Sequence, residues 1–302
     1  TSSCKDDLLG IRILKVQGTD ASFLDLHCPS LDHSVAAKLK AMVTIRVSSD
    51  LVSHRKPDLR LLCLHGHGGT PARLCGNLEV FFQSVLNGSP GDPCDGEAEA
   101  FAVECRCVAA ALPEASRREG GRQWWRYDED GYGDRPDDWA EMELATTKLA
   151  EELLTAQQAD RPFDGILGFS QGAEMVHTVA LLKHQDDPRF QSLTPRFVVS
   201  LSGAINPAHF ESVSGGGPPL DCPGPYFGPK PNEVKLPCLF VGDFVSDGWY
   251  SSQRFCRTKD LYADRTVVMH SQKHKVPSLC EVQDIQSICK VRRFFSRFVR
   301  QR

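Results

Sequence analysis

One serine of this chain lies in a pattern that is typical of a catalytic nucleophile. Ser170 is the centre of Gly168-Phe-Ser-Gln-Gly172, which follows an apolar run ending at Phe169 and precedes a helical pattern over residues 173–182. Glycines two positions to either side allow a sharp strand-to-helix turn that exposes the hydroxyl, and the helix N-terminus favours a developing negative charge. A chance Gly-x-Ser-x-Gly in a surface turn would not explain the flanking strand and helix. We therefore predict that Ser170 is a nucleophile.

A glycine-rich segment after the first strongly apolar run predicts a partner for this serine. It reads His65-Gly66-His67-Gly68-Gly69. Glycine permits close approach of the backbone, so the N–H of His67 is a candidate donor to a carbonyl oxygen beside the serine. The second candidate donor is the N–H of Gln171. A phosphate-binding loop is the alternative, but neither phosphate-binding glycine motif fits this segment, so we rank it lower.

A serine hydroxyl is a weak nucleophile and needs a base that an acid holds in the correct tautomer. For a serine on such a turn, the expected chain order is serine, acid, histidine. His270 lies at the edge of the last predicted strand and His274 lies in the loop after it, so His274 is the better placed base. Asp243 and Asp247 both follow the preceding strand, and their spacing alone leaves the acid open.

The elements that must position these residues follow a regular order along the chain. Apolar runs of strand length alternate with helical patterns from residue 59 onward. Strands are predicted at 59–64, 101–112, 165–169, 197–201, 238–241 and 266–269, and helices at 71–86, 136–158 and from about 282. This alternation predicts an α/β fold, with a mostly parallel central sheet and helices on both of its faces.

The first part of the chain does not share this regular order. We expect an N-terminal extension of unknown role over residues 1–57 and a single catalytic domain over 58–302. Within the extension, Leu9–Leu14 and Met42–Val47 have strand character and Ser34–Lys40 has helical character. The extension is interpreted either as an edge addition to the domain or as the end of an upstream domain.

Composition excludes several classes of protein. The 302 residues are 41% hydrophobic and 25% charged, as in a soluble globular chain, and 35 Lys and Arg against 39 Asp and Glu give a charge of −4. We therefore expect no nucleic-acid partner, because no basic excess is present. No apolar run approaches the roughly 20 residues that cross a bilayer, so no integral membrane segment is expected. We place the chain in the cytoplasm, although it lacks an initiator Met.

The 12 cysteines are scattered and form no Cys-x-x-Cys pair, which favours reduced thiols and no metal site.

Two aromatic-containing insertions, at 120–135 and 214–231, follow strands. The pair Trp124 and Trp125 in the first insertion is predicted to line the substrate pocket; the equal alternative is that such aromatics anchor long loops to the protein body. The basic, Phe-containing tail from Lys290 is interpreted as a terminal helix packed on the sheet rather than as a membrane-binding helix.

Five segments together resemble a known family. The most specific is Phe163-Asp-Gly-Ile-Leu-Gly-Phe-Ser-Gln-Gly-Ala173, and the others are 62–69, Trp124-Trp125, 197–203 and 270–277. These segments are similar to the FSH family of serine hydrolases. The resemblance implies an α/β-hydrolase fold with Ser170 as nucleophile and His274 as base. It also favours Asp247 over Asp243 as the acid, because Asp247 has the family's spacing to Gln253.

Two features depart from the family pattern. Gln272 and Lys273 stand where the family has glycines before its histidine, and the loop that holds the acid is about two residues longer. The resulting hypothesis is a serine esterase or thioesterase that acts on small-molecule acyl esters or thioesters through an acyl-enzyme, without a cofactor. The alternatives are a ligand-binding or interaction protein of the same fold with negligible turnover, and a peptidase of that fold.

Overall fold

The computed structural model describes residues 42–48, 56–87, 101–110, 112–113, 121–126, 136–205, 233–279 and 284–299. The contacts divide the chain into two units, residues 1–40 and 41–302, and every described residue belongs to the second. The predicted elements at Leu9–Leu14 and Ser34–Lys40 lie outside the described residues, as does most of both insertions.

Seven strands form one sheet in the order β1-β3-β2-β6-β7-β8-β9. Their bounds are β1 (Met42–Ser48), β2 (Leu59–Leu64), β3 (Ala102–Val108), β6 (Gly165–Phe169), β7 (Phe197–Leu201), β8 (Cys238–Gly242) and β9 (Arg265–Met269). All neighbours pair in parallel except β1 and β3. The central strands are almost continuous apolar runs because the sheet is covered on both faces. The predicted mostly parallel sheet is therefore confirmed.

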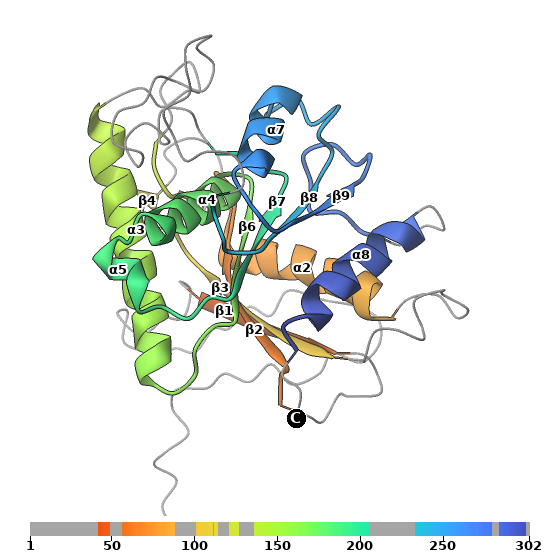
Figure 1. The fold of residues 1–302 in the computed structure, drawn as a ribbon, viewed down its shortest axis with the longest axis horizontal. Helices are drawn as coiled ribbons and strands as arrows, with labels where there is room; N and C mark the ends of the chain where they lie inside the picture. Colours follow the sequence, from red (N-terminus) through yellow and green to blue (C-terminus); the bar gives the residue numbers. More distant parts are fainter. Residues whose placement is uncertain are drawn as a thin grey trace, which may run out of the picture. The chain divides into compact units, whose positions relative to one another are not determined.

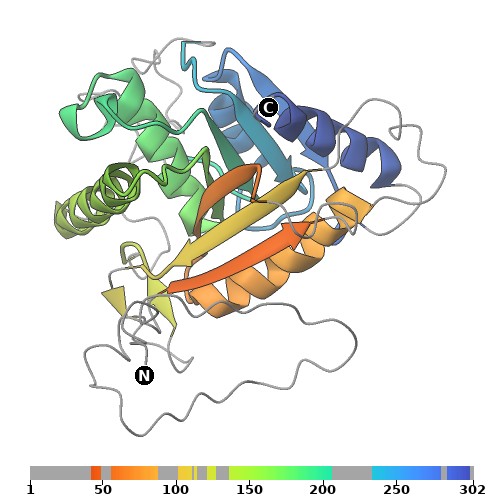
Figure 2. The ribbon, with the colours of Figure 1, turned by 90° about the horizontal axis from the view of Figure 1, so that it is seen from below.

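Strand β1 belongs to this sheet, although it lies within the N-terminal extension predicted over residues 1–57. It pairs antiparallel with β3, from Met42 opposite Val108 to Ser48 opposite Ala102. Its side chains alternate largely between exposed and half-buried, as expected for an edge strand. Figure 2 shows β1 and β3 side by side, with helix α2 (Pro71–Asn87) packed along them. The contact boundary after Lys40 thus places β1 with the sheet, whereas the sequence predicted a boundary after residue 57.

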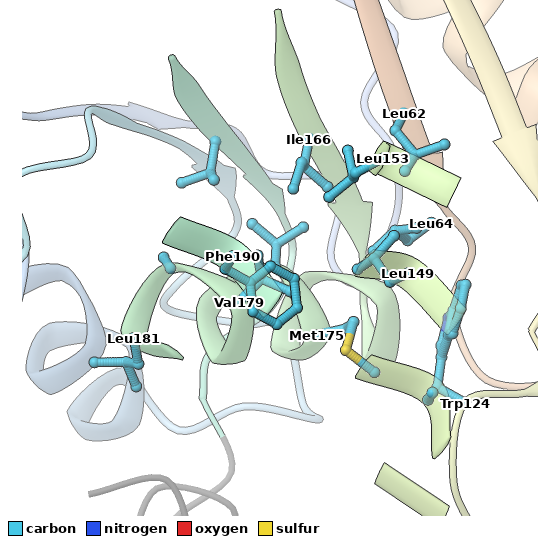
Figure 3. Packing of buried hydrophobic residues seen from close by; sticks show 14 of the residues in the cluster. Leu62, Leu64, Trp124, Leu149, Leu153, Ile166, Met175, Val179, Leu181 and Phe190 are labelled. Carbon is cyan, nitrogen blue, oxygen red and sulfur yellow. The ribbon is translucent and has the colours of Figure 1, made fainter. Parts of the chain in front are cut away.

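The helices cover the two faces of the sheet in two groups. Helices α3 (Pro136–Gln158), α4 (Gln171–His184) and α5 (Pro188–Gln191) contribute buried side chains to one apolar cluster, together with Phe255 of α7 (Ser252–Asp260). Figure 3 shows side chains of this cluster, among them Ile166 from a strand and Met175 from a helix. Helices α2 and α8 (Ile285–Ser296) lie side by side over the other face (Figure 1). A short two-stranded sheet joins β4 (Leu112–Pro113) to β5 (Arg122–Gln123).

The C-terminal tail packs on the sheet through its aromatic residues. Phe294, Phe295 and Phe298 are buried, and Phe298 packs against Phe197 of β7 with ring centroids 4.4 Å apart. This confirms the interpretation of the tail as a terminal helix that contacts the core. Among the described residues, no helix has both the length and the apolar character required to span a membrane.

The cysteines of the described part are mostly free thiols. Six of them are free, five buried and one exposed. Cys289 in α8 takes part in a disulfide, which corrects the expectation of reduced thiols at that position.

Candidate active site

Ser170 lies on the strained turn that its sequence pattern predicts. It follows β6 and directly precedes α4, with φ 54° and ψ −121°, a conformation that residues other than glycine rarely adopt. A Cβ atom at Gly168 would lie 2.1 Å from the carbonyl oxygen of Gly172, and one at Gly172 would lie 2.3 Å from that of Leu64. Both glycines are therefore required for the turn to form against β2.

The side chains of Ser170, His274 and Asp247 form a continuous hydrogen-bonded chain. The Oγ of Ser170 lies 2.8 Å from Nε2 of His274, and Nδ1 of the same ring lies 2.9 and 3.0 Å from the two carboxylate oxygens of Asp247. When Nδ1–H donates to the carboxylate, Nε2 accepts the serine proton. The Asp247 carboxylate is almost fully buried, whereas the imidazole is 16% exposed. This arrangement can remove the proton from the serine hydroxyl.

Asp247 is held in place by its own loop. Its Oδ1 accepts hydrogen bonds from the backbone N–H groups of Trp249 at 3.0 Å and Tyr250 at 3.3 Å. The Tyr250 hydroxyl in turn donates to Glu174 of α4 at 2.7 Å. The acid loop is thereby fixed to the helix that follows Ser170.

Asp243 has a different set of contacts. Its carboxylate accepts from the Ser246 backbone N–H at 3.0 Å, from the Ser246 hydroxyl, and from the Lys273 backbone N–H at 3.0 Å. Burial alone would raise the pKa of Asp243, but these hydrogen bonds outweigh it and lower the pKa. The structure therefore pairs Asp247 with the imidazole and uses Asp243 to connect two loops.

His270, the other histidine of this segment, is buried and bonds locally. Its Nδ1 accepts the backbone N–H of Gln272 at 3.1 Å, and burial lowers its pKa. These contacts agree with the expectation that His270 packs or bonds locally.

The glycine-rich segment after β2 lies directly against Ser170. A Cβ atom added at Gly66 would lie 2.8 Å from Cβ of Ser170. The His65 ring connects this segment to the residues after β3, because its Nδ1–H donates to the Gly66 carbonyl at 2.8 Å and its Nε2 accepts the Ala110 N–H at 3.1 Å. Burial lowers the pKa of His65 to about 4, so the ring is neutral near pH 7. His67 is the next residue along this segment, and Nε2 of its ring lies 2.9 Å from Oε1 of Gln123.

The side chain of Gln171 connects the turn to the tryptophan pair. It is fully buried, accepts the Trp124 backbone N–H at 3.0 Å and donates to the Trp125 carbonyl at 2.8 Å. The Trp124 indole N–H donates to the His65 carbonyl at 2.8 Å. The two indoles are only 3% and 0% exposed, and Trp124 lies in the core cluster of Figure 3. These buried rings have the contacts expected of the alternative interpretation, in which the aromatics anchor the loop, and the prediction that Trp124 and Trp125 line the substrate pocket stays a prediction.

The acid loop, residues 243–251, carries exposed apolar side chains, one of which lies beside the imidazole. Trp249 is 76% exposed and its ring centroid lies 5.8 Å from that of His274, while Val245 in the same loop is 84% exposed. Phe169 lies on another side of the imidazole, at 5.3 Å between centroids. Sequence analysis missed Trp249. The available signal was an apolar residue two positions after Asp247, in a loop where polar residues are the rule.

No group of three or more His, Cys, Asp or Glu side chains in the described part of the chain is arranged to hold a metal ion.

Comparison with known proteins identifies a family and its activity. The family described as "Serine hydrolase (FSH1)" matches residues 55–285. Esterase OVCA2 of Mus musculus is 38% identical over 183 residues, which cover 56% of this chain and 70% of the mouse protein. Esterase OVCA2 of Bos taurus is 31% identical over 188 residues, covering 57% of this chain and 71% of the bovine protein.

Solved structures agree on the fold. The acyl-protein thioesterase 2 of Zea mays superimposes with a TM-score of 0.50 at 15% identity, covering 85% of this chain and 99% of the maize chain. The predicted α/β-hydrolase fold is confirmed, and the chain is an enzyme of the esterase kind. It belongs to the FSH1 family of serine hydrolases.

Proposed function

We propose that this enzyme hydrolyses carboxylic esters and thioesters through an acyl-enzyme on Ser170. The observation that carries the proposal is the chain of hydrogen bonds from the Ser170 hydroxyl through His274 to Asp247. A nucleophile, a base and an orienting acid in this order are the parts that acyl transfer requires.

In the first half of the reaction, Nε2 of His274 takes the proton of the Ser170 hydroxyl while Oγ attacks the acyl carbon. The backbone N–H groups of His67 and Gln171 stabilise the oxyanion, and Asp247 stabilises the imidazolium. His274 then protonates the alkoxide or thiolate that leaves. In the second half, His274 takes a proton from water, the hydroxide attacks the acyl-enzyme, and the acid is released as Ser170 regains its proton.

The exposed indole of Trp249 beside His274 favours an acyl or alcohol group that is itself apolar. Trp249 and Val245 supply surface on the acid loop, and Phe169 packs against the imidazole. Burial of apolar substrate surface against such side chains contributes roughly 25 cal/mol per Å². We therefore expect esters with apolar acyl chains to be better substrates than acetates.

The central test replaces Ser170 with alanine. Turnover of a short p-nitrophenyl ester should fall by at least about 10⁴-fold, and labelling by a fluorophosphonate probe should disappear. Ser84→Ala is the matched control, because the Ser84 hydroxyl donates to the Val80 carbonyl within α2. Undiminished labelling of Ser170→Ala would exclude Ser170 as the nucleophile.

A wild-type chain that binds apolar ligands but neither labels nor turns over would favour the ligand-binding alternative. Paired esters and thioesters of one acyl chain then separate the two substrate classes.

A further inference from the structure

Four cysteines meet in the core on the face of the sheet that α2 and α8 cover. Cys63 lies opposite Cys107 on the neighbouring strand, and Cys105 lies two residues earlier on the same strand face. Cys75 reaches the group from α2. All four are buried, with 2% exposure or less.

Two of these thiols are unusually close. The Sγ atoms of Cys75 and Cys107 lie 2.7 Å apart. Uncharged heavy atoms normally rest at roughly 3.5–4.0 Å, whereas the sulfurs of a disulfide lie about 2.05 Å apart. The pair is therefore nearer to the bonded distance than to ordinary contact. The cluster is not a metal centre, since no set of three or more ligating side chains among the described residues can hold an ion.

We propose that Cys75 and Cys107 form an oxidisable pair that closes to an intramolecular disulfide when the protein meets hydrogen peroxide. This inference does not depend on the proposed ester hydrolysis. Because both sulfurs are buried, the oxidant must be small, and peroxide meets this requirement.

The chemistry assigns a distinct role to each sulfur. Burial would raise the pKa of Cys107, but the hydrogen bonds that its sulfur accepts from the Cys63 and Cys75 thiols lower it. We assign the first attack to Cys107, because its Sγ is the acceptor of the Cys75 thiol. Its sulfur attacks one peroxide oxygen and the O–O bond breaks, giving a sulfenic acid and hydroxide. Cys75 then loses its proton and attacks the sulfenic sulfur, which releases a second hydroxide. With the protons returned, two thiols and one peroxide give one disulfide and two waters.

The bond would join two segments that support the loop beside Ser170. Helix α2 begins at Pro71, directly after the 65–70 loop. Strand β3, which carries Cys107, ends at Val108, and two residues later the N–H of Ala110 donates to His65 of that loop. The cross-link would close a span of 32 residues, which restricts the unfolded chain. Oxidation should therefore stabilise the region around the 65–70 loop.

The test uses the full chain, treated with hydrogen peroxide in the folded state and then alkylated after denaturation. Peptide mapping should find Cys75 linked to Cys107, lighter by two hydrogen atoms than the free peptides. The melting temperature should rise by on the order of 10 °C and return on reduction. Cys75→Ala should lose both effects, whereas Cys105→Ala, which removes a buried neighbour outside the pair, should keep both. Each protein is compared before and after peroxide, so the disulfide at Cys289 is common to all of them.

The exposed Cys256 reports that the oxidant has reached the protein. If Cys256 is oxidised while Cys75 and Cys107 are both recovered alkylated, the pair is not oxidisable and the proposal is overturned. A link from Cys107 to Cys63 would overturn it as well. A Cys75–Cys107 link with an unchanged melting temperature would remove the stabilising role.

Discussion

The Asp243 carboxylate accepts a hydrogen bond from the backbone N–H of Lys273, 3.0 Å away. Lys273 directly precedes His274 and has φ 57°, a left-handed conformation that is unfavourable for lysine. Asp243 also accepts from Ser246 in the loop that leads to Asp247. One buried carboxylate thus fixes the loop of the histidine and the loop of the acid relative to each other.

Replacement of Asp243 should therefore weaken the enzyme by misplacing His274. Asp243→Asn keeps the size but substitutes a donor for one acceptor oxygen, so we expect kcat to fall by roughly 10–100-fold with little change in KM. Asp247→Asn, which removes the carboxylate that orients the imidazole, should lower kcat by about 10⁴-fold. Steady-state kinetics on a p-nitrophenyl ester measure both.

Lys273→Gly is the matched control: it keeps the N–H and relieves the strain, so activity should be retained. Equal losses for the two asparagine variants would contradict this division of roles.

The close contact between Gly66 and Ser170 gives a second prediction. In Gly66→Ala the new Cβ meets Cβ of Ser170 at 2.8 Å and the Phe169 ring at 3.1 Å, so the loop must move away from the serine. Because the His67 N–H, one of the two proposed oxyanion donors, moves with the loop, kcat/KM should fall by about 10²-fold or more. Gly76→Ala is the control: no atom lies within 4 Å of its Cβ in α2, so it should gain about 0.5–1 kcal/mol of stability with unchanged kinetics. A folded Gly66→Ala enzyme with full activity would show that the loop does not position the donors.

Local patterns were sufficient to predict most elements of the fold. The strands at 165–169 and 197–201 and the helix at 136–158 have the predicted bounds, because an apolar run or a helical period is a property of the segment itself. The strand predicted over 101–112 ends at Val108 instead. The N–H of Ala110, beyond its end, donates to His65 rather than to a neighbouring strand. Such a contact joins residues 45 positions apart and leaves no local signal.

In the candidate active site, too, the sequence predicted the residues that have a local signal and left open those that only tertiary contacts distinguish. The Gly-x-Ser-x-Gly pattern between a strand and a helix selected Ser170, chain order and loop placement selected His274, and the structure brings these two side chains together. Asp243 and Asp247 follow the same strand, so their position along the chain left the acid open and only the family resemblance favoured Asp247. In the structure their contacts differ, because Asp243 accepts from Lys273 and Asp247 pairs with His274. The burial of the tryptophan pair likewise depends on hydrogen bonds to Gln171, a residue 46 or 47 positions away.

Buried neutral histidines make the stability of the fold sensitive to acid. Burial lowers the pKa of His65 to about 4 and that of His177 to about 3. The His177 ring is enclosed between the Tyr262 hydroxyl at 2.7 Å and the Ser200 hydroxyl at 3.0 Å. Between these values and the unfolded pKa of about 6.5, the unfolded chain binds more protons than the folded chain. Stability is therefore fully present above about pH 6.5 and is lost as the pH falls below it.

From this linkage we expect His65 and His177 together to lower the free energy of unfolding by about 4 kcal/mol between pH 7 and pH 5, in about equal parts, and the lowered pKa of His270 adds to this decrease. Denaturant titrations at several pH values measure the change. In His177→Gln, a variant with one fewer titrating group, the overall stability should be lower, but its decrease between pH 7 and pH 5 should be smaller by about 2 kcal/mol. An unchanged pH dependence in His177→Gln would show that this histidine titrates normally in the folded protein.

The exposed indole of Trp249 should determine preference for apolar acyl groups. Trp249→Ala keeps the backbone N–H that donates to Asp247 and removes only the ring beside His274. We therefore expect kcat/KM for an octanoate ester to fall by about 5–30-fold, whereas kcat/KM for an acetate ester should be unchanged. Trp249→Phe should be intermediate. Val80→Ala, on the exposed side of α2, is the control for loss of surface apolar area and should alter neither ester. If both esters lose activity equally in Trp249→Ala, the ring acts by holding the acid loop rather than by contacting the acyl chain.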